Sequence, residues 1–256
     1  FIFGIGVTVA LVPEGLLPTV TLSFAIGAQR MADQKALVRR LESVETLGAT
    51  TVICTDKTGT ITENRMNIVA VWTPSGEAEV VGEGYEPQAQ IRCDGIALPA
   101  IEKVAAAARM ASRGEVHERA GEWLPRGDPM DAAIDVLRLR LHMSLPDMGQ
   151  EVEYLPFDPA RRMAVSRLID RVVCKGAPEA VLAACPHVPA GCDDVLHRYA
   201  TKGLRVLAVA RRRAAADDQE LKGLELLGLL AFEDPPRPGV VEAVMRARGQ
   251  AAEQHA

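Results

Sequence analysis

The sequence TVICTDKTGT at residues 51–60 constrains the fold of this chain more than any other segment. Residues Thr51–Thr55 are β-branched or small, a composition that predicts a buried strand. Asp56 follows at the carboxyl end of that strand, where open α/β sheets place their chemistry, and Gly59 permits a tight turn just after it. The segment therefore predicts an α/β domain with a reactive carboxylate at a strand end.

Asp56 has the neighbours that a nucleophilic carboxylate needs. Lys57, Thr58 and Thr60 supply a cation and two hydroxyls beside it. Such a carboxylate can attack a phosphoryl group and form an acyl phosphate, with Mg²⁺ bridging the two and neutralising charge. A lone Asp after a strand more often caps a helix, so the interpretation depends on these neighbours.

Residues 1–28 are apolar apart from one charged residue, Glu14. Their length suits a membrane span, which needs about 20 apolar residues. Pro13 removes a backbone donor, so we expect the helix to kink or unwind there. The freed carbonyls and the Glu14 carboxylate would form an oxygen-lined cation site; the alternative is a buried amphipathic helix with a proline kink. Basic residues then predict that the chain from about residue 29 onward is cytoplasmic, beside membrane lipid.

Composition excludes some other classes of function. The net charge is −5, from 29 Lys and Arg against 34 Asp and Glu, which argues against a nucleic-acid partner. The five Cys residues form no CxxC pair, so free thiols in a reducing compartment are favoured over a disulfide framework or a zinc site.

Four distinctive segments follow one another along the chain. They are PEGL at 13–16, VETLGATTVICTDKTGTITENRM at 44–66, KGAPE at 175–179 and DPPRP at 234–238. In this order and spacing they resemble the P-type ATPases, from the fourth membrane helix to the start of the second half of the phosphorylation domain. With its acidic residue, PEGL resembles the motif of the branch that moves hard cations (calcium first, sodium or potassium second), whereas heavy-metal pumps carry a Cys-containing motif there.

The resemblance implies roles for individual residues. Asp56 would be the catalytic residue that ATP phosphorylates, with Lys57 and Thr58 beside it. Mg²⁺ would be held by Asp56 and by the carbonyl of Thr58. The ligands of the transported cation would be Glu14 and the carbonyls of Val9, Ala10 and Val12.

The resemblance also implies an α/β fold in which a haloacid-dehalogenase-like phosphorylation domain, present in part, carries an inserted α+β nucleotide-binding domain. The expected parts are a partial transmembrane helix at 1–28, the first part of the phosphorylation domain at 29–65, the nucleotide-binding domain at 66–232, and a hinge with the start of the second part at 233–256. Within the insertion, sequence patterns predict an antiparallel sheet with helices on one face. The expected strands are 67–72, 152–156, 163–169, 171–174, 205–210 and 225–230; the expected helices are 99–112, 129–142, 178–184 and 193–202, with a loop at 74–99.

Several residues of the insertion are candidates for binding the nucleotide. Phe157 offers a flat face for adenine, and Lys175 follows a strand where Gly176 leaves the backbone bare. Arginine suits phosphate recognition, which makes Arg205 and either Arg161 or Arg162 candidates. The resemblance adds Asp128, Asp131, Asp234 and Arg237, although Met130 and Asp131 stand where the family commonly has Thr and Glu.

The function expected is ATP-driven cation transport across a membrane through an aspartyl phosphate on Asp56. The chain ends in QAAEQHA, where the family continues into a strand ending in TGD and then GDGxND. We therefore expect little turnover from this chain without the remainder of the pump, because an incomplete phosphoryl-transfer site loses electrostatic stabilisation. One alternative is an ATP-binding remnant without catalysis. Another is a soluble haloacid-dehalogenase-type phosphatase, disfavoured because Thr58 stands where those enzymes usually have a second Asp.

Overall fold

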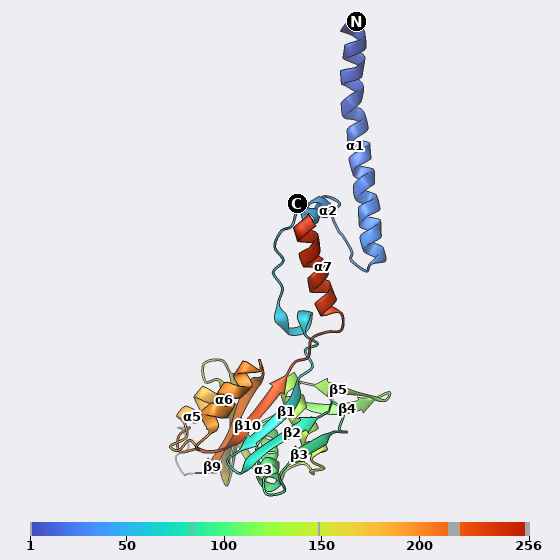
Figure 1. Cartoon of the computed structure of the whole chain (residues 1–256). Coiled ribbons are helices and arrows are strands. Elements are labelled where there is room, and N and C mark those ends of the chain that lie inside the picture. Colours follow the sequence, from blue (N-terminus) through green and yellow to red (C-terminus); the bar gives the residue numbers. More distant parts are fainter. Residues whose placement is uncertain (1, 83, 148, 215–220, 254–256) are drawn as a thin grey trace. The chain divides into compact units, whose positions relative to one another are not determined.

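The computed structural model of this chain describes residues 2–82, 84–147, 149–214 and 221–253, with the side chains of residues 2–15 and 250–253 left outside the description. It divides into two compact units, Phe1–Thr55 with Glu242–Ala256, and Asp56–Val241. Each is taken by itself below (Figure 1).

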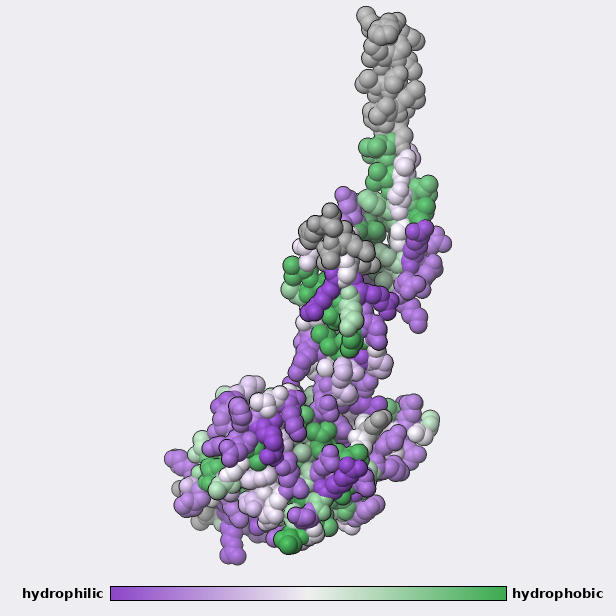
Figure 2. Space-filling view, viewed as in Figure 1, coloured by the Kyte–Doolittle hydropathy of each residue, from purple (hydrophilic) through white to green (hydrophobic). Residues whose placement is uncertain are grey.

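The first unit contains the long helix α1 (Ile2–Asp33) and the short helix α2 (Glu42–Gly48). Apolar side chains on the described part of α1 are exposed, among them Leu17 at 75% (Figure 2). Within the described residues, no helix combines the length and the hydropathy that crossing a bilayer requires. The helix α7 (Val240–Glu253) begins at the end of the second unit.

One prediction for this part of the chain was wrong in part, and another was wrong. The helix α1 continues through Pro13 without unwinding, since a long helix tolerates the loss of one internal hydrogen bond, and the alternative of a kink at Pro13 stays a prediction. Residues 51–55 form no strand and are exposed. A strand needs a neighbour to supply its backbone hydrogen bonds, and none of the described strands pairs with this segment.

The second unit is built on an eight-stranded antiparallel sheet in the order β3-β2-β1-β10-β9-β8-β7-β6. The strands β1 and β10 come from opposite ends of the sheet's sequence, yet they are neighbours in the sheet and pair directly. A separate hairpin pairs β4 with β5. The strands are β1 (Asn67–Thr73), β2 (Gly76–Val81), β3 (Gln90–Cys93), β4 (Glu115–Arg119), β5 (Glu122–Arg126), β6 (Glu151–Asp158), β7 (Met163–Leu168), β8 (Arg171–Gly176), β9 (Arg205–Arg213) and β10 (Glu225–Glu233).

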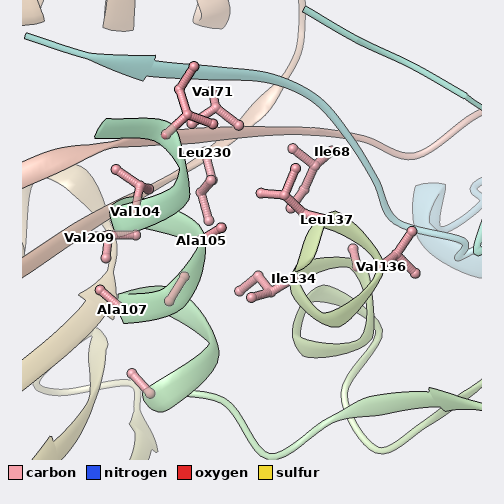
Figure 3. Close-up of a cluster of buried hydrophobic side chains, with 14 of the residues drawn as sticks. Ile68, Val71, Val104, Ala105, Ala107, Ile134, Val136, Leu137, Val209 and Leu230 are labelled. Atoms are coloured by element: carbon pink, nitrogen blue, oxygen red, sulfur yellow. The ribbon is translucent and has the colours of Figure 1, made fainter. Parts of the chain in front are cut away.

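Helices cover both faces of this sheet, so the prediction of helices on one face was wrong. The helices α3 (Leu98–Met110) and α4 (Pro129–Arg140) pack on one face, and α5 (Pro178–Ala183) and α6 (Cys192–Thr201) on the other. Successive strand residues alternate between the two cores: Leu230 packs under α3 (Figure 3), and Leu229 faces the core that contains Val181. Each face of an antiparallel sheet can be buried independently, which explains why all residues from Leu226 to Phe232 are buried.

The predicted strands and helices of the second unit are confirmed to within a few residues, but the loop predicted at 74–99 is wrong in part. It contains the edge strands β2 and β3. In β2, buried Ala78 and Val80 alternate with exposed Glu77 and Glu79, a period of two that the surrounding Gly and Pro residues obscured.

Candidate functional site

A pocket with a volume of about 630 Å³ opens where β6, β7, β8 and β9 lie side by side and the N-terminus of α4 approaches them. This volume lies within the range of small-molecule sites, about 300–1,000 Å³. The residues that line it are Asp128, Met130, Asp131, Tyr154, Pro156, Phe157, Ala164, Lys175, Gly176, Ala177, Arg205, Val206 and Leu207. The sequence had singled out six of them, from segments up to 77 positions apart (128 to 205).

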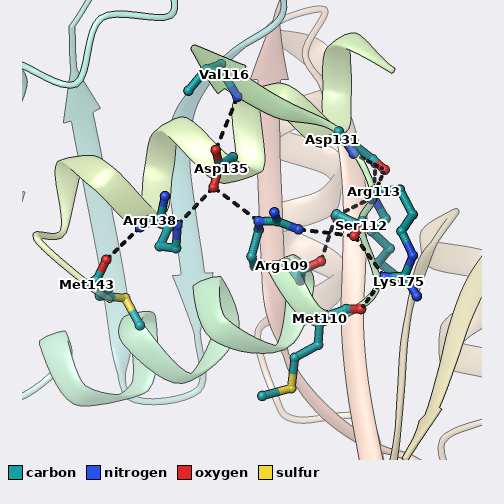
Figure 4. Close-up of polar contacts among 12 residues, drawn as sticks. Arg109, Met110, Ser112, Arg113, Val116, Asp131, Asp135, Arg138, Met143 and Lys175 are labelled. Carbon is teal, nitrogen blue, oxygen red and sulfur yellow. Dashed lines mark hydrogen bonds and ion pairs between the residues drawn. The ribbon is translucent and has the colours of Figure 1, made fainter. Parts of the chain in front are cut away.

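Lys175 lies at the end of β8 with its side chain only 6% exposed. Its ammonium forms an ion pair with Asp131 and donates to Ser112 Oγ at 2.7 Å (Figure 4). Burial lowers the pKa of Lys175, and the neighbouring Asp131 carboxylate acts in the opposite direction. A cation in this setting is fixed in place and poorly hydrated, so a polar ligand group would interact with it strongly.

Asp131 is held from its other side by backbone donors. Its Oδ2 accepts from the amide of Arg113 at 2.8 Å and from that of Gly114 at 3.4 Å. A Cβ on Gly114 would lie 2.6 Å from the Cβ of Asp131, so this close approach requires glycine. The carboxylate is therefore oriented before any ligand arrives.

Asp128 serves as the N-cap of α4. Its Oδ1 accepts from the amides of Met130 at 2.9 Å and Asp131 at 3.2 Å. This satisfies two amides of the first helical turn and fixes the position of Asp131, while Asp128 itself borders the pocket.

The aromatic side chains of the pocket come from β6. Phe157 is 59% exposed, which leaves its ring available to a ligand. Tyr154 is stacked by the guanidinium of Arg113 at 3.7 Å from the ring centroid, and burial raises its pKa. Arg205 begins β9, is exposed, and lies with its guanidinium 3.8 Å from the sulfur of Met130. The apolar ring of Phe157 and the exposed guanidinium of Arg205 thus border the same pocket.

Gly176 and the two consecutive arginines have different placements. A Cβ on Gly176 would lie 2.4 Å from the carbonyl oxygen of Arg162, which fits the predicted bare backbone. Arg161 donates to the carbonyls of Pro156 at 2.7 Å and Met163 at 3.2 Å, and Arg162 pairs with Glu179 at 2.8 Å. Arg161 thus connects β6 to β7, Arg162 connects the turn between them to α5, and neither arginine lines the pocket.

Asp234 and Arg237 both lie on the segment that leaves the sheet after β10, beside the segment that enters it before β1, and neither lines the pocket. Asp234 accepts from Thr62 Oγ1 at 2.6 Å and from the amide of Arg65 at 3.2 Å. Arg237 donates to the carbonyls of Thr62 at 3.1 Å and Gly59 at 2.8 Å. These bonds connect the segment that follows β10 to the segment that precedes β1.

Asp56 is exposed and precedes the compact turn η1 (Lys57–Ile61), in which Gly59 adopts a φ of 77°. Thr58 is extended at φ −76° and ψ 123°. No group of three or more His, Cys, Asp or Glu residues is arranged to hold a metal ion in the part of the chain that the structure describes. The side chains of Val9, Ala10, Val12 and Glu14 lie outside the described residues.

Comparison with known proteins decides the family. A model of the P-type ATPase cytoplasmic domain N matches residues 100–239, more than half of the 256 residues. The chain belongs to the P-type ATPase family. The matched region contains every residue that lines the pocket, so the pocket lies within the domain N of this P-type ATPase chain.

Curated P-type ATPases resemble nearly the whole chain. A calcium-transporting ATPase of Bacillus subtilis (strain 168) is 32% identical over 279 residues, covering 97% of this chain and 31% of the relative. The probable cation-transporting ATPase F of Mycobacterium tuberculosis (strain ATCC 25618 / H37Rv) is 36% identical over 280 residues, covering 95% and 30%. The human calcium-transporting ATPase type 2C member 1 is 32% identical over 273 residues, covering 95% and 28%. The chain thus spans about a third or less of the length of these relatives.

Sequence reasoning missed Ser112, Tyr154, Val206 and Ala164. Ala164 could have been found, because it is the direct partner of Lys175 between β7 and β8. Val206 follows Arg205 in a predicted strand. Ser112 gave no signal, since it meets Lys175 only through the packing of α3 on the sheet.

Proposed function

We propose that this chain binds ATP in the pocket between α4 and strands β6–β9, as the nucleotide-binding part of an ATP-driven cation pump. The observation that carries the proposal is the convergence of Phe157, Lys175 and Arg205 on one pocket. A nucleotide has a flat aromatic base and a polyanionic tail, and the pocket offers an exposed ring, a buried ammonium and an exposed guanidinium.

Each side chain would have a separate task in binding. The ring of Phe157 would stack on the base, and Lys175 would donate to an acceptor on the nucleotide from its fixed position. Arg205 would pair with phosphate oxygens, for which the guanidinium geometry is suited. Asp131 would keep Lys175 charged and oriented.

We further propose that Asp56 is the phosphoryl acceptor in the whole pump. Its carboxylate oxygen would attack the γ-phosphorus of ATP, the bond from that phosphorus to the bridging oxygen would break, and ADP would leave with that oxygen. Mg²⁺ would neutralise the charge, and the Asp56 carboxylate and the Thr58 carbonyl are the hard oxygen donors that it prefers. Water would later cleave the acyl phosphate.

The names of the relatives support a cation as cargo and make calcium the first candidate, ahead of sodium or potassium. Residues 1–28 would then be part of a membrane helix of the hard-cation (P2) branch, with Glu14 and the carbonyls of Val9, Ala10 and Val12 as ligands. The chain from about residue 29 would face the cytoplasm, and the cation would cross when the rest of the pump responds to phosphorylation.

A second candidate is an ATP-binding protein without turnover. The pocket alone would support it, because binding requires no phosphoryl acceptor and the lining of the pocket includes none of Asp56, Lys57 and Thr58. A phosphatase of the haloacid-dehalogenase type is less well supported, since Thr58 offers no carboxylic acid to assist hydrolysis.

The test is calorimetric titration of the 256-residue chain with MgATP. Phe157→Ala should weaken binding about tenfold, because stacking of a base on an aromatic ring contributes about 1–3 kcal/mol. Ile169→Ala is the matched control: Ile169 is also exposed, at 61%, but does not line the pocket. Absence of ATP binding by the unsubstituted chain, or equal losses in both variants, would refute the proposal.

A further inference from the structure

Ser112 contacts Lys175, and the proposed function gives it no task. It follows α3, is fully buried, and lies 63 positions before Lys175 in the sequence. Its carbonyl accepts from Arg109 Nη1 at 3.2 Å and from Arg113 Nη1 at 3.1 Å, and its amide donates to the carbonyl of Arg109 at 3.1 Å. Bonds on both sides of the residue hold its backbone in place (Figure 4).

The two hydrogen bonds of the Ser112 hydroxyl can run in only one direction. It lies 2.7 Å from the carbonyl oxygen of Ala108 and 2.7 Å from Lys175 Nζ. A carbonyl oxygen can only accept and an ammonium can only donate. The hydroxyl proton therefore points to Ala108, and a lone pair of the oxygen faces the ammonium.

These contacts account for two of the three ammonium hydrogens of Lys175. One is directed at Asp131, which lies on α4, and one at Ser112, which follows α3. No third acceptor bonds to this ammonium within the described residues, and Lys175 lines the pocket, so the third hydrogen can point to a ligand. Two fixed acceptors determine both the position of the ammonium and the direction of its third N–H bond, whereas one acceptor would leave the side chain able to pivot about it.

We propose that Ser112 is a positioning residue for nucleotide binding: its hydroxyl and the Asp131 carboxylate together orient the Lys175 ammonium so that a single N–H bond points to an acceptor on the ligand. The inference rests on the proposed function, since it takes the ligand of the pocket to be a nucleotide. The hydroxyl of Ser112 bonds to Lys175 and to the carbonyl of Ala108, and Ser112 does not line the pocket, so the hydroxyl would affect the ligand through Lys175.

The experiment measures MgATP affinity of the 256-residue chain from pH 7 to 10. In Ser112→Ala we expect affinity at pH 7 to fall about tenfold, the size of a lost hydrogen bond to a charged group. The ammonium also loses an acceptor that favours its charged form, so its pKa, already lowered by burial, should fall further. As pH rises, affinity should therefore drop at a lower pH in the variant than in the unsubstituted chain.

The other titratable groups that face Lys175 or the pocket are present in both proteins. They are Asp131, Asp128, Arg109, Arg205 and Tyr154. A matched control is Thr73→Val, which removes another buried hydroxyl that donates to a carbonyl, that of Gly76 at 2.9 Å, outside the pocket. If Ser112 contributes to folding alone, Ser112→Ala and Thr73→Val should both lower the melting temperature, and neither should change the pH midpoint of ATP binding.

The outcomes separate the two proposals. Failure of the unsubstituted chain to bind ATP refutes the proposed function and this inference with it. Normal binding by the unsubstituted chain, with Ser112→Ala equal to it in affinity and pH midpoint, refutes the inference alone. Should Ser112→Ala not fold, Ser112→Cys keeps most of the volume and exchanges the oxygen for a poor acceptor; it should show the same loss and the same shift, and an unchanged profile would overturn the inference.

Discussion

Asp135 shows how one residue can connect two helices and a hairpin. It is 3% exposed on α4, and its Oδ1 accepts from Arg138 at 2.9 Å and from Arg109 at 3.1 Å. Its Oδ2 accepts from the amide of Val116 in β4 at 3.2 Å. Replacing such a cluster by apolar residues can be neutral, but removing one member leaves buried charges without a partner.

We therefore expect Asp135→Ala to lower the free energy of unfolding by about 3–5 kcal/mol, measured by urea denaturation. The matched control is Glu79→Ala, which breaks the exposed pair with Arg92, 3.3 Å apart, and should cost no more than about 1 kcal/mol. Similar costs for the two substitutions would show that the two arginines find other partners.

The strand β10 depends on a glycine where a helix crosses it. The pairing of β10 with β9 shifts register between Leu226 and Gly228. A Cβ on Gly228 would lie 2.2 Å from the carbonyl oxygen of Trp72 and 2.9 Å from the side chain of Val104 on α3. The absence of a side chain thus allows α3 and β1 to approach β10 together.

Gly228→Ala should destabilise the domain by about 1–3 kcal/mol, because backbone atoms rather than a flexible side chain would have to move. Thermal unfolding followed by circular dichroism would measure it. Gly95→Ala is the control, since no atom lies within 4 Å of the Cβ that the substitution adds. The unfolding temperature of this variant should match that of the unsubstituted chain. An unchanged unfolding temperature in Gly228→Ala would mean that the sheet relaxes without cost.

At the scale of secondary-structure elements, sequence patterns predicted the helices and strands whose composition is distinctive. They failed where the structure depends on residues that are far away in the sequence. Buried strands such as β8 and β10 were found because their composition is distinctive. The prediction of a strand at 51–55 was wrong, because composition does not tell whether another strand lies beside the segment to pair with it. Within the site, the motifs gave Lys175 and Phe157, but Ser112 could not be predicted because tertiary packing alone brings it to Lys175.

At the scale of the whole molecule, the chain carries the proposed ATP pocket and the proposed phosphoryl acceptor on segments far apart in sequence. The pocket lies within residues 128–207, and Asp56 precedes η1. The relatives are about three times as long as this chain, with 31% of the Bacillus subtilis protein matched. Turnover is thus a property to test in a complete pump that contains this segment.

In such a pump, incubation with γ-phosphate-labelled ATP should label the protein, and hydroxylamine should release the label, as it does from acyl phosphates. Asp56→Asn should abolish labelling because an amide cannot accept the phosphoryl group. Asp94→Asn is the control, as Asp94 is also exposed but lies in the loop between β3 and α3. Label retained in Asp56→Asn would exclude Asp56 as the acceptor.

The pairing of β1 with β10 has a consequence for how such a domain can be acquired. Asn67 and Glu233 are direct partners, and Thr62 bridges Pro236, so the chain leaves the sheet beside the point where it entered. A segment whose two ends are neighbours can be spliced into a surface turn of another protein without separating the host's flanking residues. During evolution, this module could have been gained, lengthened or exchanged among genes as a cassette, while the host fold kept its own geometry.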